Sequence, residues 1–211
     1  MNKLFAFAAT AVLGAALLIS GCGSSTNNES SSSSKPEVLK VAANPVPHAE
    51  ILEQVKPILA KEGVDLQIIE FTDYIQPNMA LSSHEVDANF FANVPYQNNY
   101  NKDHGTNFVS FAPVHIEPLA IYSQKIKDLK DLPNGAKVAI PSDPTNSARA
   151  LLLLQSAGLV TLKDPTGLTN TPFDVTSNPK NIQITELEAA QIPRSIQDLD
   201  AAVINANYAL P

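Results

Sequence analysis

The sequence has very little cysteine: Cys22 is the only one among its 211 residues. A lone cysteine excludes an internal disulfide, so the packing of apolar side chains has to stabilise the folded part. The sequence also lacks a Gly-x-Ser-x-Gly motif, a phosphate-binding loop and a marked acid–base pair. We therefore predict that the protein is not an enzyme. The formal net charge of −7 argues against nucleic acid as a partner.

The N-terminus is typical of a lipoprotein signal peptide at residues 1–21. Lys3 supplies a short positive start, and the apolar run at 4–19 is too short for a comfortable membrane span. The run ends in two small residues before Cys22, a pattern at which the processing peptidase cuts and the cysteine is acylated. We predict lipidation at Cys22 and a lipid anchor on the extracytoplasmic face of the cell membrane. The alternative is an ordinary secreted protein with a chance cysteine.

The remainder of the chain divides into a tether and an α/β region. Residues 22–37 are rich in serine, which predicts a flexible tether. Strand-like and helix-like segments then alternate in two blocks, as in βαβ units. This pattern predicts an α/β fold with two lobes, 38–117 and 118–204, a cleft between them, and a return crossover at 205–211 toward the first lobe.

The expected elements follow from the apolar patterns and the turn residues. The predicted strands are 39–43, 64–70, 87–91, 108–111, 119–122, 137–140, 181–187 and 201–204. The predicted helices are 48–61, 75–81, 95–102, 125–132, 146–157 and 189–199. Pro57 is expected to kink or split the first of these helices, and 162–179 is expected to be mostly loop.

The stretch DPTNSAR carries the strongest candidate for a binding site. Asp143 is a good N-cap and Pro144 a good first helical residue. Asn146 and Arg149 follow three residues apart, so they share one face of the helix start. A helix N-terminus beside an arginine fork suits a carboxylate ligand. The alternative is a capped helix with a solvated arginine.

Three further segments place polar and aromatic side chains near strand ends. The segment 87–96 gathers Phe90, Phe91, Tyr96 and two asparagines around a strand end, which suits an amphipathic small ligand. The alternative is that Phe90 or Phe91 packs in the core. His115 and Glu117 alternate to the same face of an extended segment. Asn205 directly follows a buried strand, where ligands bind in open α/β sheets.

The histidines provide little support for a metal site. A metal-binding protein could assemble distant histidines, but their spacing matches no tight ligand motif. The four positions are 48, 84, 104 and 115. We predict no metal and no cofactor.

The chain resembles the NlpA/MetQ family of substrate-binding lipoproteins, the methionine-binding components of ABC importers. The matching stretches are PHAEILE at 47–53, QPNMAL at 76–81, DANFF and PY within 87–96, VHIEPLAIYS at 114–123, VAIPSDPTNSARALLLLQ at 138–155, LEAAQIPR at 187–194 and AAVINANYAL at 201–210. They cover essentially the whole chain after the tether.

The resemblance implies a two-lobed, periplasmic-binding-protein-like (Venus flytrap) fold, type II-like, that closes on one amino acid. By the same resemblance, Arg149 grips the ligand carboxylate, and Asn146 and Asn205 are its polar partners. The implied wall around the thioether side chain consists of Phe91, Tyr96 and His115, with Tyr74 and Glu117 as further candidates.

The chain departs from the family pattern in two places. Members often carry a histidine where this chain has Asn93, and members continue beyond the point where this chain ends, at Pro211. We interpret the chain as a truncated product in which the C-terminal part of the first lobe is missing.

The resemblance implies capture of L-methionine or a close analogue for an ABC importer permease and its ATPase, without catalysis. Another amino acid, D-methionine or a methionine dipeptide are alternatives on the same scaffold. A structural or adhesive surface lipoprotein with a vestigial pocket is an alternative of another class.

Overall fold

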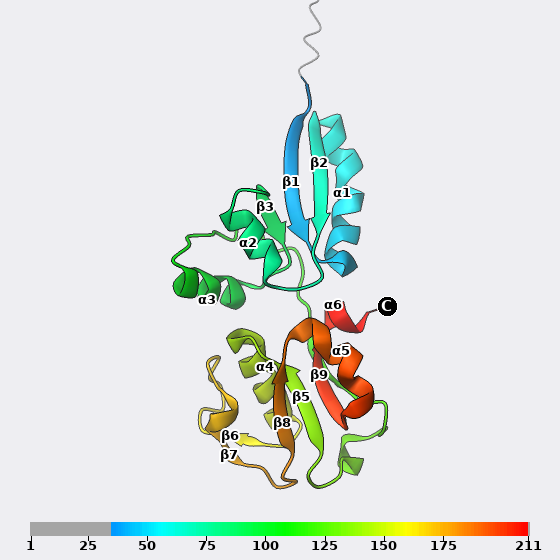
Figure 1. The fold of residues 1–211 in the computed structure, drawn as a ribbon, viewed down its shortest axis with the longest axis vertical. Coiled ribbons are helices and arrows are strands. Elements are labelled where there is room, and N and C mark those ends of the chain that lie inside the picture. The colour runs from blue at the N-terminus through cyan, green and yellow to red at the C-terminus, as the bar shows by residue number, and fades with distance from the viewer. Residues whose placement is uncertain (1–34, 211) are drawn as a thin grey trace, which may run out of the picture. The chain divides into compact units, whose positions relative to one another are not determined.

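The computed structural model describes residues 35–210 (Figure 1). The predicted signal peptide, Cys22 and most of the predicted tether lie outside these residues. Over the described part of the chain, every helix is too short or too polar to cross a membrane.

The first half of the described chain forms a parallel three-stranded sheet in the order β2-β1-β3. Its strands are β1 (Glu37–Ala43), β2 (Val64–Glu70) and β3 (Ala88–Phe90). Helix α1 (Glu50–Lys61) connects β1 to β2 and lies beside β2, while α2 (Gln76–Ser82) connects β2 to β3 (Figure 1). This is the βαβ arrangement that the alternating pattern predicted.

The second half forms a four-stranded sheet in the order β4-β9-β5-β8. Its strands are β4 (Leu119–Tyr122), β5 (Lys137–Pro141), β8 (Gln183–Leu187) and β9 (Ala201–Asn205). Strand β4 runs antiparallel to β9, and the other pairs are parallel. The predicted lobe boundaries at 117/118 and 204/205 stay predictions. The strands of the three-stranded sheet all come before 117, and those of the four-stranded sheet all begin after 118.

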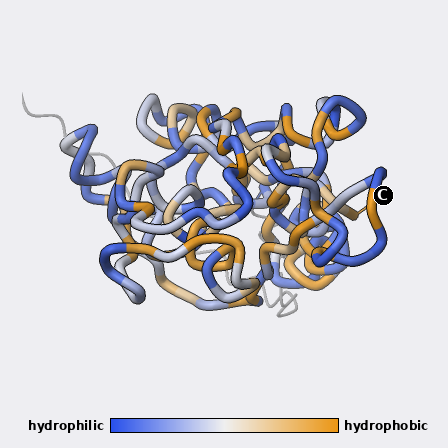
Figure 2. Tube along the Cα trace, turned by 90° about the horizontal axis from the view of Figure 1, so that it is seen from below, coloured by the Kyte–Doolittle hydropathy of each residue, from blue (hydrophilic) through white to orange (hydrophobic). Residues whose placement is uncertain are grey.

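The remaining elements connect or cover these sheets. They are the helices α3 (Val94–His104), α4 (Pro144–Ser156), α5 (Ile192–Ser195) and α6 (Ala206–Ala209), and a small ribbon of β6 (Thr161–Leu162) and β7 (Val175–Ser177). Along the chain, hydrophobic stretches alternate with hydrophilic ones (Figure 2). The apolar stretches supply the strands and the buried helix faces.

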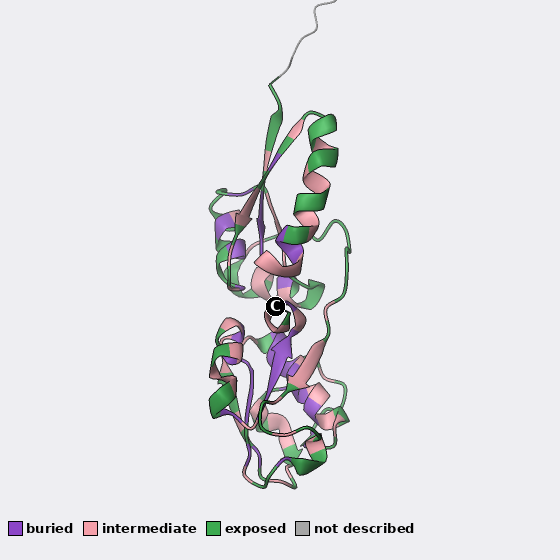
Figure 3. Cartoon of the chain, turned by 90° about the vertical axis from the view of Figure 1, so that its right-hand side faces the viewer, coloured by how far each residue is buried: buried purple, intermediate pink, exposed green. Residues whose placement is uncertain are grey.

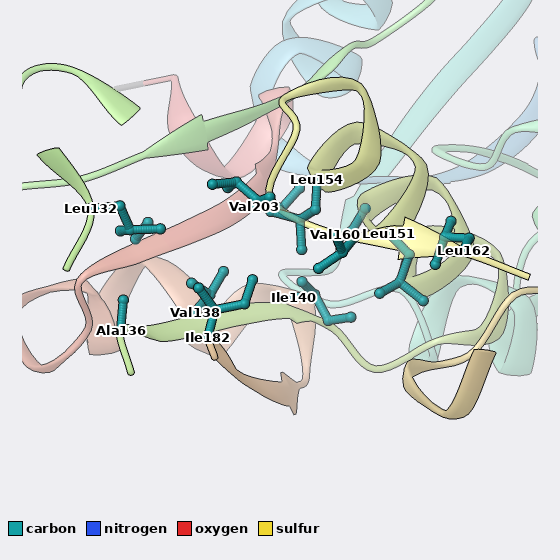
Figure 4. Packing of buried hydrophobic residues seen from close by; sticks show 13 residues of the cluster. Leu132, Ala136, Val138, Ile140, Leu151, Leu154, Val160, Leu162, Ile182 and Val203 are labelled. Atoms are coloured by element: carbon teal, nitrogen blue, oxygen red, sulfur yellow. The ribbon is translucent and has the colours of Figure 1, made fainter. Parts of the chain in front are cut away.

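The largest apolar core lies between the four-stranded sheet and α4 (Figure 4). Val138 and Ile140 of β5 and Val203 of β9 are fully buried, as are Leu151 and Leu154 of α4. In Figure 3 the buried colour is concentrated on these strands, whereas α1 is exposed or half-buried. The leucine run of α4 therefore anchors the helix whose first turn carries the candidate site.

The predicted strand at 108–111 is wrong. Residues 106–118 have no regular secondary structure, and several apolar side chains there are exposed, Phe111 at 87%. The backbone N–H and carbonyl of Phe108 bond to the Asn101 side chain instead of a strand. The alternating pattern is suited to a strand, but it finds no partner strand among the described residues.

Three helix predictions need correction. The segment 125–132 contains only a 3₁₀ turn at Leu129–Asp131, because the Asp128 side chain caps the Lys130 N–H and turns the chain. The segment 189–199 is broken into short turns around α5, where Pro193 lacks an N–H. Pro57 does not split α1, because it lies on the exposed face where water can bond to the freed carbonyl. A kink at Pro57 stays a prediction.

The core predicts a clear contrast between two leucines. We expect Leu151→Ala to lower the free energy of unfolding by about 2–5 kcal/mol, because it opens a cavity in the core. We expect Leu168→Ala, at a side chain that is 59% exposed, to change it by under about 0.5 kcal/mol. Urea unfolding measures both. Equal effects would contradict the placement of α4 on the sheet.

Candidate functional site

The first turn of α4 is fixed by Asp143. Its carboxylate accepts a hydrogen bond from the backbone N–H of Asn146 at 2.9 Å, with Pro144 as the first helical residue. The Asn146 side-chain amide also donates to the Asp143 carboxylate, at 2.9 Å to Oδ2. Burial raises the pKa of Asp143, and the hydrogen bonds from Asn146 oppose that rise. The predicted N-cap is confirmed, and it also orients the Asn146 side chain.

The side-chain carbonyl oxygen of Asn146, Oδ1, bonds to residues of two elements, α4 and β9. It accepts from Arg149 Nη1 at 2.7 Å and from Asn205 Nδ2, at the end of β9, at 3.2 Å. Arg149 Nη2 donates to the Glu117 carbonyl oxygen at 3.0 Å. A guanidinium has five N–H groups, so these two bonds fix its position and leave three donors for other partners.

Asn205 carries an unused acceptor. Its side chain is 7% exposed, and its Oδ1 atom has no hydrogen-bond partner among the described residues. An unpaired buried carbonyl costs about 1–3 kcal/mol. Because Asn205 lines the same pocket as Arg149, a donor from a bound molecule would remove this cost.

Three aromatic rings form one wall of the site. The ring centroids of Tyr74, Phe91 and Tyr96 are 5.7–6.0 Å apart. The Tyr96 hydroxyl donates to the Tyr74 carbonyl at 2.8 Å, and the Tyr74 hydroxyl donates to Asn207 Oδ1 at 2.5 Å. Burial raises the pKa of Tyr74 and of Tyr96, so both hydroxyls are neutral at physiological pH. The three rings therefore present an apolar surface to a ligand. The hydrogen bonds of the two hydroxyls hold Tyr74 and Tyr96 in place.

A third group of side chains comes from the segments after β1 and before β4. His48 Nε2 and His115 Nε2 lie 3.1 Å and 2.6 Å from the same oxygen, Glu117 Oε1. His48 is 3% exposed, and burial lowers the pKa of its imidazole. The contact between His115 and Glu117 agrees with their predicted placement on one face of an extended segment.

These groups line one pocket with a volume of about 140 Å³. It contains all eight residues predicted for the site: Tyr74, Phe91, Tyr96, His115, Glu117, Asn146, Arg149 and Asn205. The structure brings them together, while their roles in binding stay predictions. The pocket also contains His48 and Asn93, which were not predicted as site residues. His48 lies in the PHAEILE stretch, so the sequence did hold a signal for it.

Residues 39–211 match the model of the NlpA lipoprotein family. The chain belongs to the NlpA lipoprotein family. This confirms the predicted family and the prediction that the protein is not an enzyme, since the family consists of non-catalytic substrate-binding lipoproteins.

Relatives of this NlpA family chain are similar over nearly all of it. The D-methionine-binding lipoprotein MetQ of Salmonella typhimurium is 42% identical over 211 residues, which span 98% of this chain and 75% of the relative. A lipoprotein structure from Ruminococcus gnavus is 50% identical, with a TM-score of 0.80 over 82% of this chain and 72% of its own.

A nutrient-binding protein from Burkholderia cenocepacia, solved bound to methionine, is 48% identical to this NlpA family chain. Its TM-score is 0.78, over 82% of this chain and 73% of its own. The predicted α/β fold of the periplasmic-binding-protein type is confirmed at this level of detail.

The pKa of His48 predicts how stability depends on pH. The pKa of the His48 imidazole in the folded chain lies below the usual 6.5, because the ring is buried. Between pH 6.5 and that lower pKa the unfolded chain binds a proton that the folded chain does not, so the free energy of unfolding decreases as the pH falls. We expect the melting temperature of the chain to fall between pH 7.5 and 5.5, and to fall less in His48→Gln. The exposed His104 supplies the control. If His48→Gln and His104→Gln show the same pH slope, His48 is not the titrating group.

Proposed function

We propose that this protein binds L-methionine, or a close analogue, in the pocket around Arg149 and passes it to an ABC importer. One observation carries the proposal: the pocket holds a fixed guanidinium with unused donors next to a buried amide oxygen with no donor. A free amino acid offers the complement of both, a carboxylate and an ammonium group.

Arg149 is the partner for the carboxylate. It is half-buried and forms no salt bridge among the described residues. Burial lowers its pKa, but a guanidinium stays charged at any physiological pH. A ligand carboxylate supplies the missing counter-ion in a planar, two-bond geometry. Because Asn146 and the Glu117 carbonyl already hold the side chain, little of its conformational freedom is left to lose on binding.

Asn205 and Glu117 are the partners for the ammonium group. Asn205 Oδ1 accepts one of its three N–H bonds, which satisfies the buried oxygen. Glu117 adds a negative charge to the same pocket. The ligand is thus placed between a positive and a negative group of the protein, as a zwitterion requires.

The aromatic wall receives the ligand side chain. Tyr74, Phe91 and Tyr96 present ring faces and edges, and His115 lines the same pocket. A thioether sulfur makes favourable contacts with aromatic rings, worth about 0.3–1.5 kcal/mol each. A flexible, unbranched side chain such as that of methionine also adapts to an irregular wall.

Asn93 has a definite role at this wall. Its side chain accepts the backbone N–H of Tyr96 at 2.9 Å and so caps α3. The asparagine therefore replaces the family's frequent histidine with a helix cap that positions Tyr96. Because this residue of the pocket lining differs from the family pattern, other ligands are also candidates. One of them is D-methionine, which the Salmonella relative is named for binding.

The relatives support the wider part of the proposal. We infer a type II-like Venus flytrap with lobes at 38–117 and 118–204, whose cleft closes on the ligand, and a return crossover at 205–211. A lipid on Cys22 holds the protein at the extracytoplasmic face of the membrane. There it meets the importer permease, which works with its ATPase.

The carboxylate assignment is tested with the two arginines of the chain. We expect Arg149→Ala to weaken methionine binding at least tenfold, about 1.4 kcal/mol or more, because the ligand carboxylate loses its counter-ion. Arg194→Ala removes an exposed arginine from α5 and is the matched control. Isothermal titration calorimetry measures both. Unchanged methionine binding by Arg149→Ala would contradict the assignment of the Arg149 guanidinium to the ligand carboxylate.

The ligand class is tested with a panel. A ligand that binds only the folded state raises the melting temperature, and at 100 times its Kd it adds about 2.7 kcal/mol. We expect L-methionine to raise it more than leucine, D-methionine or glycyl-methionine at equal concentration. A larger shift with D-methionine or the dipeptide would move the assignment to that ligand. No shift with any of them would favour the structural or adhesive role.

A further inference from the structure

The pocket contains a second group of ligand-like atoms that the amino-acid site does not use fully. His48, His115 and Glu117 each offer one possible ligand atom, and these atoms all lie within 4.8 Å of one another. We propose that this trio is a binding site for a divalent transition-metal ion of the Zn²⁺ class. The metal site shares His115 and Glu117 with the proposed amino-acid site, but its evidence is the convergence of three side chains and does not involve Arg149 or Asn205.

The donor set and its spacing suit zinc. Two imidazoles and one carboxylate are a common ligand set for a zinc site that keeps one position open. Metal–ligand bonds of about 2.0–2.2 Å put the ligand atoms of a tetrahedral site about 3.4 Å apart. His48 Nε2 is 3.1 Å from Glu117 Oε1, and His115 Nε2 is 2.6 Å from it. His115 is 26% exposed, so it can swing outward by the distance of under about 1 Å that an ion requires.

The proton positions of the metal-free trio also favour a cation. If His48 carries its proton on Nε2, its buried Nδ1 is an acceptor with no partner among the described residues. If the proton is on Nδ1, the Nε2 lone pair faces a carboxylate oxygen at 3.1 Å. A metal ion on Nε2 removes the repulsion and keeps the proton on Nδ1, as in many zinc sites.

The charge around the trio leaves room for a cation. Glu117 contributes a negative charge and Arg149 a positive one to the pocket lining, and Asp143 adds a second negative charge that acts on Arg149. With neutral imidazoles, the sum is one negative charge. Because all three ligand residues line the pocket, the open coordination position faces the cleft, where a water molecule completes the tetrahedron.

The experiment uses the full chain, purified in detergent and stripped with a chelator. We expect calorimetry to show one equivalent of Zn²⁺ bound at pH 7.5, and Co²⁺ to give the visible absorption of a four-coordinate site. His115→Ala and Glu117→Gln each remove one ligand and should weaken Zn²⁺ binding at least about tenfold. Binding should also weaken at pH 5.5, because protonated imidazoles cannot bind a metal.

The matched control is His84→Asn, outside the trio. His84 is exposed and has a φ of 59°, which asparagine tolerates. The control should bind Zn²⁺ like the unaltered chain. The proposal is overturned if the unaltered chain shows no saturable Zn²⁺ binding, or if His115→Ala and His84→Asn bind it equally. The first of these results would identify the trio as a hydrogen-bonded support of the pocket only.

A methionine titration of the same samples keeps the two proposals apart. Zinc binding that depends on His115 supports the metal site whether or not methionine binds. Methionine binding without zinc binding overturns the metal site and leaves the amino-acid proposal intact.

Discussion

The side chain of Asn146 connects three polar residues of the site, Asp143, Arg149 and Asn205. Its backbone N–H and its amide both bond to Asp143, which fixes the first turn of α4, and its carbonyl oxygen receives Arg149 and Asn205. The side chain is 2% exposed, so water cannot replace these partners without opening the helix start. A neutral amide does this well, since it offers two donors and one acceptor oxygen with two lone pairs. An aspartate here would face Asp143 with a like charge.

Much of the site could be predicted from the sequence because its signals are local. A cap residue, a proline and an arginine three positions after Asn146 define the helix start, and the residue after a buried strand defines Asn205. Tyr74 came from the resemblance to a family alone, whereas the aromatic segment 87–96 had already indicated Phe91 and Tyr96. The proximity of His48 to His115 and Glu117 could not be predicted, because it depends on how the segments after β1 and before β4 meet.

The errors in the fold have two causes, a missing partner strand in one segment and local turns within two others. The segment 108–111 alternates like a strand, but no strand lies beside it among the described residues. The segments 125–132 and 189–199 have helical composition, but Asp128 and Pro193 turn the chain within them. Strand β2 and helix α4, in contrast, match their predictions within two residues, because buried neighbours support the local pattern.

The short helix α6 has a consequence for how long a ligand stays bound. Asn207 accepts the Tyr74 hydroxyl, and the Tyr208 hydroxyl donates to the Thr72 carbonyl at 3.1 Å. Both bonds join the end of β9 to the loop that follows β2. The two sheets cannot separate unless these bonds break or the chain bends between Asn205 and α6. The residence time of any molecule in the pocket is therefore tied to this link as well as to the contacts with the molecule itself.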